Sequence, residues 1–229
     1  MKLNPTKKLR ILIMTAVEAE RDAVLRGLQG ADSFDVYLAG VGPVSAAAST
    51  AALLAKSRYD LVISAGIGGG FKDRATTGSI VIASSIIAAD LGAESPDHAE
   101  GFASVDELGF GSSLIPVQQD LSSLLLGRLT AEEVSACYGP IVTLSTVTGT
   151  ADTASKLTRR IPGVAAEAME GYGVALAARQ LDIPVMEIRA ISNLVGPRQR
   201  ELWKIGDALK SLELACSKLP ELFSEVLSS

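Results

Sequence analysis

Residues 165–196 read AAEAMEGYGVALAARQLDIPVMEIRAISNLVG, a helical pattern followed at once by a strand pattern. The first half is rich in Ala, Gly, Val and Leu, and it predicts a buried helix from Glu170 to Gln180. Residues 184–192 form a run of apolar and β-branched residues, typical of a strand buried on both faces. A helix that leads directly into such a strand is the repeating unit of α/β proteins.

The same alternation continues through the rest of the chain. Strands are expected at residues 9–17, 34–42, 60–66, 78–92 (one long strand or a pair) and 140–148. Helices are expected at 18–28, 43–55, 117–129, 150–161 and from about Arg200 onward, with a break or kink at Pro220. Residues 94–115 are polar and glycine-rich, which predicts a loop.

No linker divides the chain, so we expect a single domain over residues 1–229. Strands that alternate with helices predict a three-layer α/β fold. Its central twisted sheet is expected to be mixed but mostly parallel, with helices on both faces. Ligands of such sheets bind at the carboxyl ends of the strands.

Composition excludes several classes of function. The net charge is −5, and basic residues cluster only at residues 1–10, which we expect to be a solvated N-terminus rather than a nucleic-acid surface. No apolar run approaches the roughly 20 residues of a membrane-spanning helix. Two cysteines and one histidine, His98, argue against a disulfide framework, a metal site and a Ser-His-Asp triad. We therefore expect a cytoplasmic protein without a metal.

Three polar residues stand where the pattern calls for apolar ones. Glu170 opens the buried helix, and Arg189 and Asn193 lie on the buried strand. An unpaired buried charge costs several kcal/mol, so such groups persist when they are paired or used. A structural Glu170–Arg189 pair is one alternative, and Asn193 could begin a turn, but together they predict a polar site inside the core.

Two further signals lie at other strand ends. Glu18 and Glu20 follow the first strand, where acidic residues favour the first turn of a helix and where one of them could also act as a base. The segment Ala65–Gly70 reads AGIGGG, but its spacing does not fit GxGxxG. A tight turn is the favoured interpretation. The alternative is a strand end, beginning at Gly66, that lacks side chains so that a sugar can approach the backbone.

Five motifs occur in a recognisable order: AVEAE (16–20), AGVGPVSAA (39–47), SAGIGGGF (64–71), AMEG (168–171) and RAISN (189–193). This order resembles the purine nucleoside phosphorylase / methylthioadenosine nucleosidase family, over about residues 10–227. Within it, ADLGAE, DELGFG and EIRAISNLVGPR are similar to the branch that hydrolyses futalosine to hypoxanthine and dehypoxanthine futalosine in the alternative menaquinone pathway. The resemblance implies a nucleoside phosphorylase-like fold, a nucleoside substrate, no cofactor and a homo-oligomer, most often a dimer.

The resemblance also implies the roles of individual residues. Glu20 corresponds to the glutamate that activates the hydrolytic water, and Arg189 to the arginine near that water. Met169 and Glu170 correspond to the pair that holds the ribose. Ser192 and Asn193 correspond to the residues that face the purine.

Departures from the family pattern carry information about the substrate. Adenine-cleaving nucleosidases have an aspartate where this chain has Asn193. A side-chain amide complements the O6/N7 edge of a 6-oxopurine rather than the amine of adenine. Ile67 replaces a serine that is frequent near the sugar, and Asp152 replaces an aromatic residue, so the stacking partner of the base is unassigned.

The first loop favours hydrolysis over phosphorolysis. Related phosphorylases carry a Gly-Asp-Pro segment and an arginine there, whereas AVEAE holds two carboxylates that would repel phosphate. An adenine-type nucleosidase, a phosphorylase and a non-catalytic nucleoside-binding protein remain as alternatives. Futalosine carries a benzoate, for which Arg198 and Arg200 are the candidate cations, although both could equally be solvated.

Overall fold

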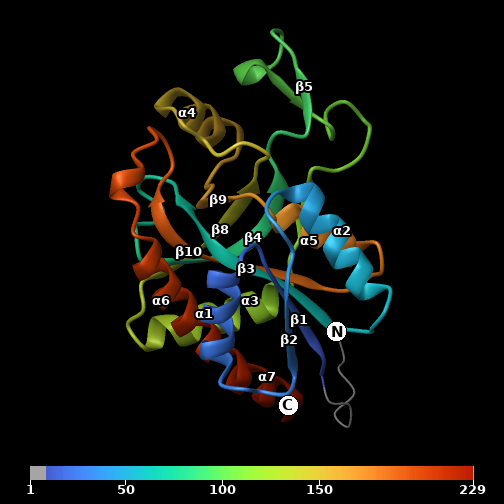
Figure 1. The fold of residues 1–229 in the computed structure, drawn as a ribbon. Helices are drawn as coiled ribbons and strands as arrows, with labels where there is room; N and C mark the ends of the chain where they lie inside the picture. Colours follow the sequence, from blue (N-terminus) through green and yellow to red (C-terminus); the bar gives the residue numbers. More distant parts are fainter. Residues whose placement is uncertain (1–8, 229) are drawn as a thin grey trace.

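A computed structural model describes residues 9–228 and gives an α/β fold with one central sheet (Figure 1). The strands are β1 Ile11–Thr15, β2 Phe34–Leu38, β3 Leu61–Gly70, β4 Ile80–Ala88, β5 Gly92–Glu94, β6 Phe102–Ser104, β7 Leu114–Pro116, β8 Ala136–Thr143, β9 Ala166–Ala168 and β10 Val185–Leu194. The helices are α1 Glu18–Leu28, α2 Pro43–Leu54, α3 Gln119–Ala131, α4 Ala151–Arg160, α5 Gly171–Arg179, α6 Ile205–Ser217 and α7 Leu219–Ser228, with 3-10 turns η1 Ala99–Gly101 and η2 Arg200–Leu202. Most of the basic stretch 1–10 lies outside the described residues.

The sheet is mixed and mostly parallel, as expected. Its strands follow the order β10-β4-β8-β9-β3-β1-β2, with β7 on β4. The pairs β1–β2, β1–β3, β3–β10, β4–β8 and β8–β9 are parallel, whereas β4–β10, β3–β9 and β4–β7 are antiparallel. Because β10 also pairs with β3, the strands β10, β4, β8, β9 and β3 close into a ring.

Helices cover both faces of the sheet (Figure 1). Helices α1 and α6 pack together on one face, and α2 and α5 pack together on the other. Successive residues of a strand point to opposite faces, so Ile13 joins the first core and Leu12 the second. Both faces are buried, which explains why the strand sequences are continuous apolar runs rather than alternating ones.

The glycine-rich segment is a correction to the expected tight turn. Residues Gly66 to Gly70 continue β3 as extended strand and pair with β10 and β9. The glycines are required by close neighbours rather than by a turn. A Cβ on Gly68 would stand 2.7 Å from the carbonyl oxygen of Glu167, and one on Gly70 would stand 2.4 Å from that of Ala75.

Other boundaries also differ from the expectation. The predicted loop 94–115 contains η1, β6 and part of β7, and β6 pairs with β5 in a small hairpin that projects from the top of the molecule in Figure 1. The strand expected at 140–148 is β8, which begins and ends earlier, and 78–92 holds one long strand, β4. The short strand β9 was not predicted, because three residues are too few to show the alternating pattern of a strand.

The C-terminal region follows the prediction more closely. Helices α6 and α7 are separated at Lys218, and Pro220 lies in the first turn of α7, where its missing N–H breaks no helical hydrogen bond. Among the described residues, no helix combines the length and apolar character needed to cross a membrane.

Candidate active site

Glu20 lies in the first turn of α1, directly after β1, and its side chain is buried at 3% exposure. One carboxylate oxygen accepts hydrogen bonds from the N–H groups of Ala16 (2.8 Å) and Val17 (3.3 Å). The other accepts the N–H of Ile67 on β3 at 2.9 Å. Burial raises the pKa of Glu20, whereas Arg189 and the N–H groups of Ile67 and Ala16 oppose that rise. Glu20 is therefore a fixed carboxylate whose proton affinity is increased, as a general base requires.

Gly66 separates Glu20 from Arg189 on β10. A Cβ at Gly66 would stand 2.6 Å from Arg189 Nη1 and 2.6 Å from Glu20 Oε1. The absence of a side chain on Gly66 is therefore what allows the charged ends of both residues to converge on this part of β3. This reason differs from the close approach of a sugar considered from the sequence.

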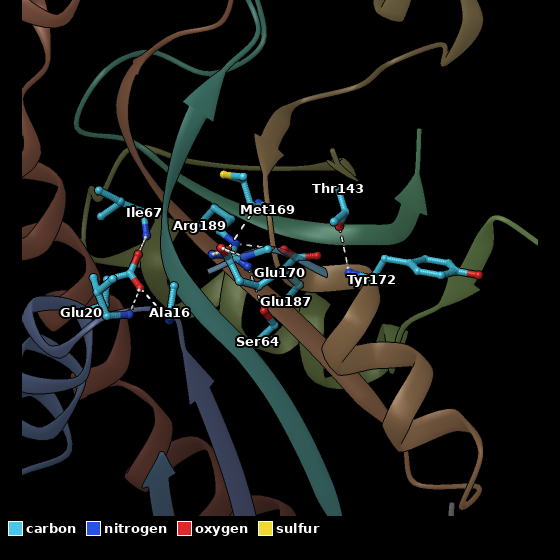
Figure 2. A network of polar contacts seen from close by, with 12 residues as sticks. Ala16, Glu20, Ser64, Ile67, Thr143, Met169, Glu170, Tyr172, Glu187 and Arg189 are labelled. Carbon is cyan, nitrogen blue, oxygen red and sulfur yellow. Dashed lines mark hydrogen bonds and ion pairs between the residues drawn. The ribbon is translucent and has the colours of Figure 1, made fainter. Parts of the chain in front are cut away.

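Arg189 is the centre of a buried polar network (Figure 2). Its side chain is 1% exposed. The guanidinium donates to Glu187 Oε1 from Nε (2.9 Å), to Ser64 Oγ from Nη2 (2.8 Å) and to Glu170 Oε2 from Nη1 (3.3 Å). Burial alone would lower the pKa of Arg189, but the carboxylates of Glu187, Glu170 and Glu20 outweigh it and raise that pKa.

Glu170 lies at the N-cap position of α5 and is 6% exposed. It accepts hydrogen bonds from the N–H groups of Gly42 and Met169, both at 3.3 Å. The N-terminus of α5 and the guanidinium of Arg189 both place positive charge beside this carboxylate. Met169, half-buried beside it, comes from the segment between β9 and α5. These bonds are long, so the carboxylate has room to accept further donors.

Ser192 and Asn193 form a second polar group, farther along β10. A register shift between Ile191 and Asn193 marks a β-bulge there. The Ser192 hydroxyl lies 2.8 Å from Asn193 Oδ1 and 3.2 Å from the carbonyl of Gly68, and Asn193 Nδ2 donates to the carbonyl of Leu194 at 3.0 Å. Asn193 also lines a cavity of about 340 Å³.

Several other residues singled out from the sequence lie away from this network. The Glu18 side chain is 76% exposed and lies 4.0 Å from Arg21, so it does not share the buried setting of Glu20. Arg198 and Arg200 are exposed, and the Arg198 guanidinium lies 5.7 Å from the centre of the Trp203 ring. The Asp152 side chain is 71% exposed and pairs with Lys156 in the first turns of α4.

Two buried glutamates were not predicted from the sequence. Glu187 is fully buried, and its Oε2 has no hydrogen-bond partner among the described residues. Its position two residues before Arg189 places both side chains on the same strand face, a signal that the sequence contains. Glu167 on β9 is 5% exposed and accepts hydrogen bonds from the N–H of Thr148 (2.8 Å) and from its hydroxyl.

The carboxylates of the network are not arranged as a metal site. Within the described part of the chain, no group of three or more His, Cys, Asp or Glu side chains is placed to hold a metal ion. His98 lies on an exposed loop, with Nδ1 2.8 Å from Ser95 Oγ, and Cys137 and Cys216 are free thiols.

The comparison with protein families decides where this fold belongs. The profile of the phosphorylase superfamily matches residues 17–228, which include Glu20, Ser64, Glu170, Glu187 and Arg189. The chain belongs to this superfamily. The match begins at Val17, the N-cap of α1 and three residues before Glu20, and ends at the last residue of α7.

Two curated relatives of this superfamily member carry the same name. The futalosine hydrolase of Streptomyces coelicolor is 48% identical, over 92% of this chain and 95% of the relative. The futalosine hydrolase of Acidothermus cellulolyticus is 44% identical, over 91% of this chain and 89% of the relative. Among solved structures, the native futalosine hydrolase of Helicobacter pylori superposes with a TM-score of 0.78, covering 95% of this chain and 98% of that one. Its sequence identity is 17%, so this likeness supports the fold alone.

Proposed function

We propose that this protein hydrolyses the N-glycosidic bond of futalosine, releasing hypoxanthine and dehypoxanthine futalosine within the alternative menaquinone pathway. The proposal is supported by the two relatives named futalosine hydrolase, at 48% and 44% identity. The observation that carries the chemistry is the buried carboxylate of Glu20, held by three backbone N–H groups beside Arg189.

Glu20 is the proposed general base. As water attacks C1′ of the ribose, Glu20 accepts its proton, and the bond between C1′ and the purine nitrogen breaks with its electron pair going to the base. Its pKa is raised by burial, so the proton is accepted more readily than by an exposed glutamate. Its N–H donors fix the carboxylate, which limits the reorganisation needed during the reaction.

Glu170, Met169 and Gly66 are the proposed sugar-binding residues, and Arg189 is the proposed orienting cation. The Glu170 carboxylate would accept the 2′- and 3′-hydroxyls, and its negative charge would favour the positive charge that develops on the ribose. Arg189 lies between Glu170 and the region of Glu20 and keeps the carboxylates apart. Around this one buried cation lie three buried carboxylates, Glu20, Glu170 and Glu187.

Ser192 and Asn193 are the proposed base-binding residues. The Asn193 amide can donate to O6 or N7 of hypoxanthine and so stabilise the negative charge on the departing base. The Asn193 amide donates to the carbonyl of Leu194, and it would exchange this contact for one with the base. The side-chain amide of Asn193 complements a 6-oxopurine, which argues against an adenine-type nucleosidase.

The remaining assignments follow from the same proposal. We propose that the protein is cytoplasmic, works as a homo-oligomer, most simply a dimer, and functions as one domain without a cofactor. Arg198 is proposed to contact the benzoate of the substrate, since its exposed guanidinium lies beside Trp203 in the segment that follows Asn193.

Product analysis tests the proposal directly. The purified protein is incubated with futalosine, inosine and methylthioadenosine, with and without phosphate, and released bases and sugars are separated by chromatography. We expect hypoxanthine from futalosine, at a rate that phosphate does not change. Phosphate-dependent turnover would indicate a phosphorylase. Faster release of adenine from methylthioadenosine would indicate an adenine-type nucleosidase. If no nucleoside is turned over, the protein is a non-catalytic nucleoside-binding protein.

A further inference from the structure

Glu167 is a buried carboxylate that the proposed chemistry does not use. It lies on β9, the shortest strand of the ring, and it is 5% exposed. Burial raises its pKa, and the hydrogen bonds from Thr148 oppose that rise. These two bonds leave part of the acceptor capacity of the carboxylate free, because an ionised carboxylate offers about four acceptor sites.

The strand register brings Glu167 and Asn193 to the two sides of one glycine. Gly69 on β3 pairs with Glu167 on β9 and with Asn193 on β10. Directly paired residues point to the same face of a sheet, so the side chains of Glu167 and Asn193 lie on one face, two strands apart. Two strand spacings of a flat sheet span about 10 Å, and closure of the ring brings β9 and β10 closer than that. A Cβ on Gly69 would stand 3.3 Å from Asn193 Nδ2, so the amide lies beside the backbone of Gly69, which has no side chain.

Two loops meet beside these three residues. Thr148, which holds Glu167, lies in the loop between β8 and α4, and Arg198 lies in the loop after β10. The Arg198 N–H donates to the carbonyl of Gly149 at 3.2 Å, which ties one loop to the other. Glu167 and Asn193 thus flank Gly69 on the two neighbouring strands, and the two loops are joined close to both residues.

The chemistry of these groups matches the edge of a 6-oxopurine. Such a base presents acceptors at O6 and N7 and a donor at N1–H, whereas adenine presents an amine at C6 and an acceptor at N1. Asn193 donates to the first edge, and a carboxylate, which only accepts, is the complement of N1–H. We infer that Glu167 accepts the N1–H of the purine and thereby selects 6-oxopurines against adenine.

This inference deepens the proposed function and rests on it for the identity of the base. Opposite adenine, the Glu167 carboxylate would face the lone pair of N1 without a proton between them, and a site built for one polar edge rejects the mismatched one strongly. The competing role for Glu167 is to hold the Thr148 loop in place. That role would affect every purine alike, since it does not involve the N1 edge.

Direct binding of free bases separates the two roles without depending on turnover. Isothermal titration of the full-length protein is carried out with hypoxanthine, with 1-methylhypoxanthine, which lacks the N1–H, and with adenine. We expect the wild type to bind hypoxanthine at least ~10-fold more tightly than either of the other two, because a charge-assisted hydrogen bond is lost. Equal affinities for hypoxanthine and its 1-methyl derivative would overturn the inference, even if futalosine is hydrolysed.

Two variants make the assignment specific to Glu167. In Glu167→Gln the side-chain amide can donate to N1 of adenine, so the preference for hypoxanthine over adenine should fall at least ~5-fold. In the control Thr148→Val the carboxylate remains but its hydroxyl partner is removed, and the preference for hypoxanthine over 1-methylhypoxanthine should stay within about 3-fold of wild type. If Glu167→Gln weakens all three bases by the same factor, Glu167 only supports the loop.

Discussion

Replacing Glu187 by glutamine tests whether this fully buried residue is neutral or charged. Burial, opposed mainly by Arg189, raises the pKa of Glu187 from 4.5 to about 7. One of its oxygens has no hydrogen-bond partner among the described residues. Leaving such an oxygen buried costs less free energy in a neutral carboxyl group than in a carboxylate. Glutamine has the shape of the protonated acid and cannot ionise.

The sign of the pH dependence follows from proton binding. Between about pH 4.5 and pH 7 the folded protein holds a proton on Glu187 that the unfolded chain releases, so stability falls as pH rises through this window. Each pKa unit corresponds to about 1.36 kcal/mol, so ionisation of Glu187 destabilises the fold by about 3 kcal/mol at pH 8 relative to pH 4.5. Glu187→Gln removes this contribution. We expect the variant to lie within about 1 kcal/mol of wild type at pH 5 and to gain about 2–3 kcal/mol relative to it by pH 8.

Urea unfolding followed by circular dichroism at pH 5, 6, 7 and 8 measures the difference. Protein concentration is kept constant, because subunit association would change apparent stability. Glu18→Gln, at an exposed glutamate, is the matched control and should leave the curve unchanged. The reasoning is refuted if Glu187→Gln is less stable than wild type by about 3–5 kcal/mol at pH 8, because that is the effect of removing one partner of a charged buried pair.

Four further predictions follow from the site. Glu20→Gln should fold normally but lower kcat at least ~10²-fold, because an amide cannot accept the proton of water; near-wild-type turnover of futalosine would exclude Glu20 as the base. Glu170→Ala should raise KM and lower kcat, and it should lower Tm because it removes one carboxylate partner of Arg189; a lower Tm with full specific activity would leave Glu170 a purely structural role. Gly171→Ala should destabilise the fold by ~1–3 kcal/mol in urea, since its Cβ would stand 2.2 Å from both Glu187 oxygens, and the double variant Gly171→Ala/Glu187→Ala should recover part of that loss if this clash is the cause. Asn193→Asp should shift the ratio of kcat/KM values from futalosine toward methylthioadenosine, and an unchanged ratio would show that Asn193 does not read the base.

The order of strands and helices could be predicted because it rests on long apolar runs with a clear period. Glu170 and Arg189 could also be predicted, because each places a charge in a segment that is otherwise apolar. Glu20 follows the first strand beside Glu18, and only the family resemblance favoured it as the base. The extended strand conformation of Gly66 to Gly70 could not be predicted from the sequence. Glycines favour turns locally, and here the need for them arises from Arg189, Glu167 and other neighbours distant in sequence.

Glu167 and Glu187 were missed for different physical reasons. Glu187 shares a strand face with Arg189, and the alternation of side chains along the strand could have exposed the pairing. Glu167 lies on a three-residue strand whose partners, Gly69 and Thr148, become neighbours only when β9 enters the ring. No local pattern in the sequence encodes that contact.

The closure of the strand ring by β10 has a consequence for folding. Ser64 and Arg189, which bond across it, are 125 residues apart in the sequence. Contacts between such distant segments form slowly, because the chain loses loop entropy before the contact stabilises it. A chain emerging from the ribosome can assemble β1 to β3 early, but Arg189 reaches Ser64 and the glutamates only after nearly the whole polypeptide has been synthesised. The polar network is therefore expected to be among the last parts of the molecule to form, and activity should report on the completion of folding.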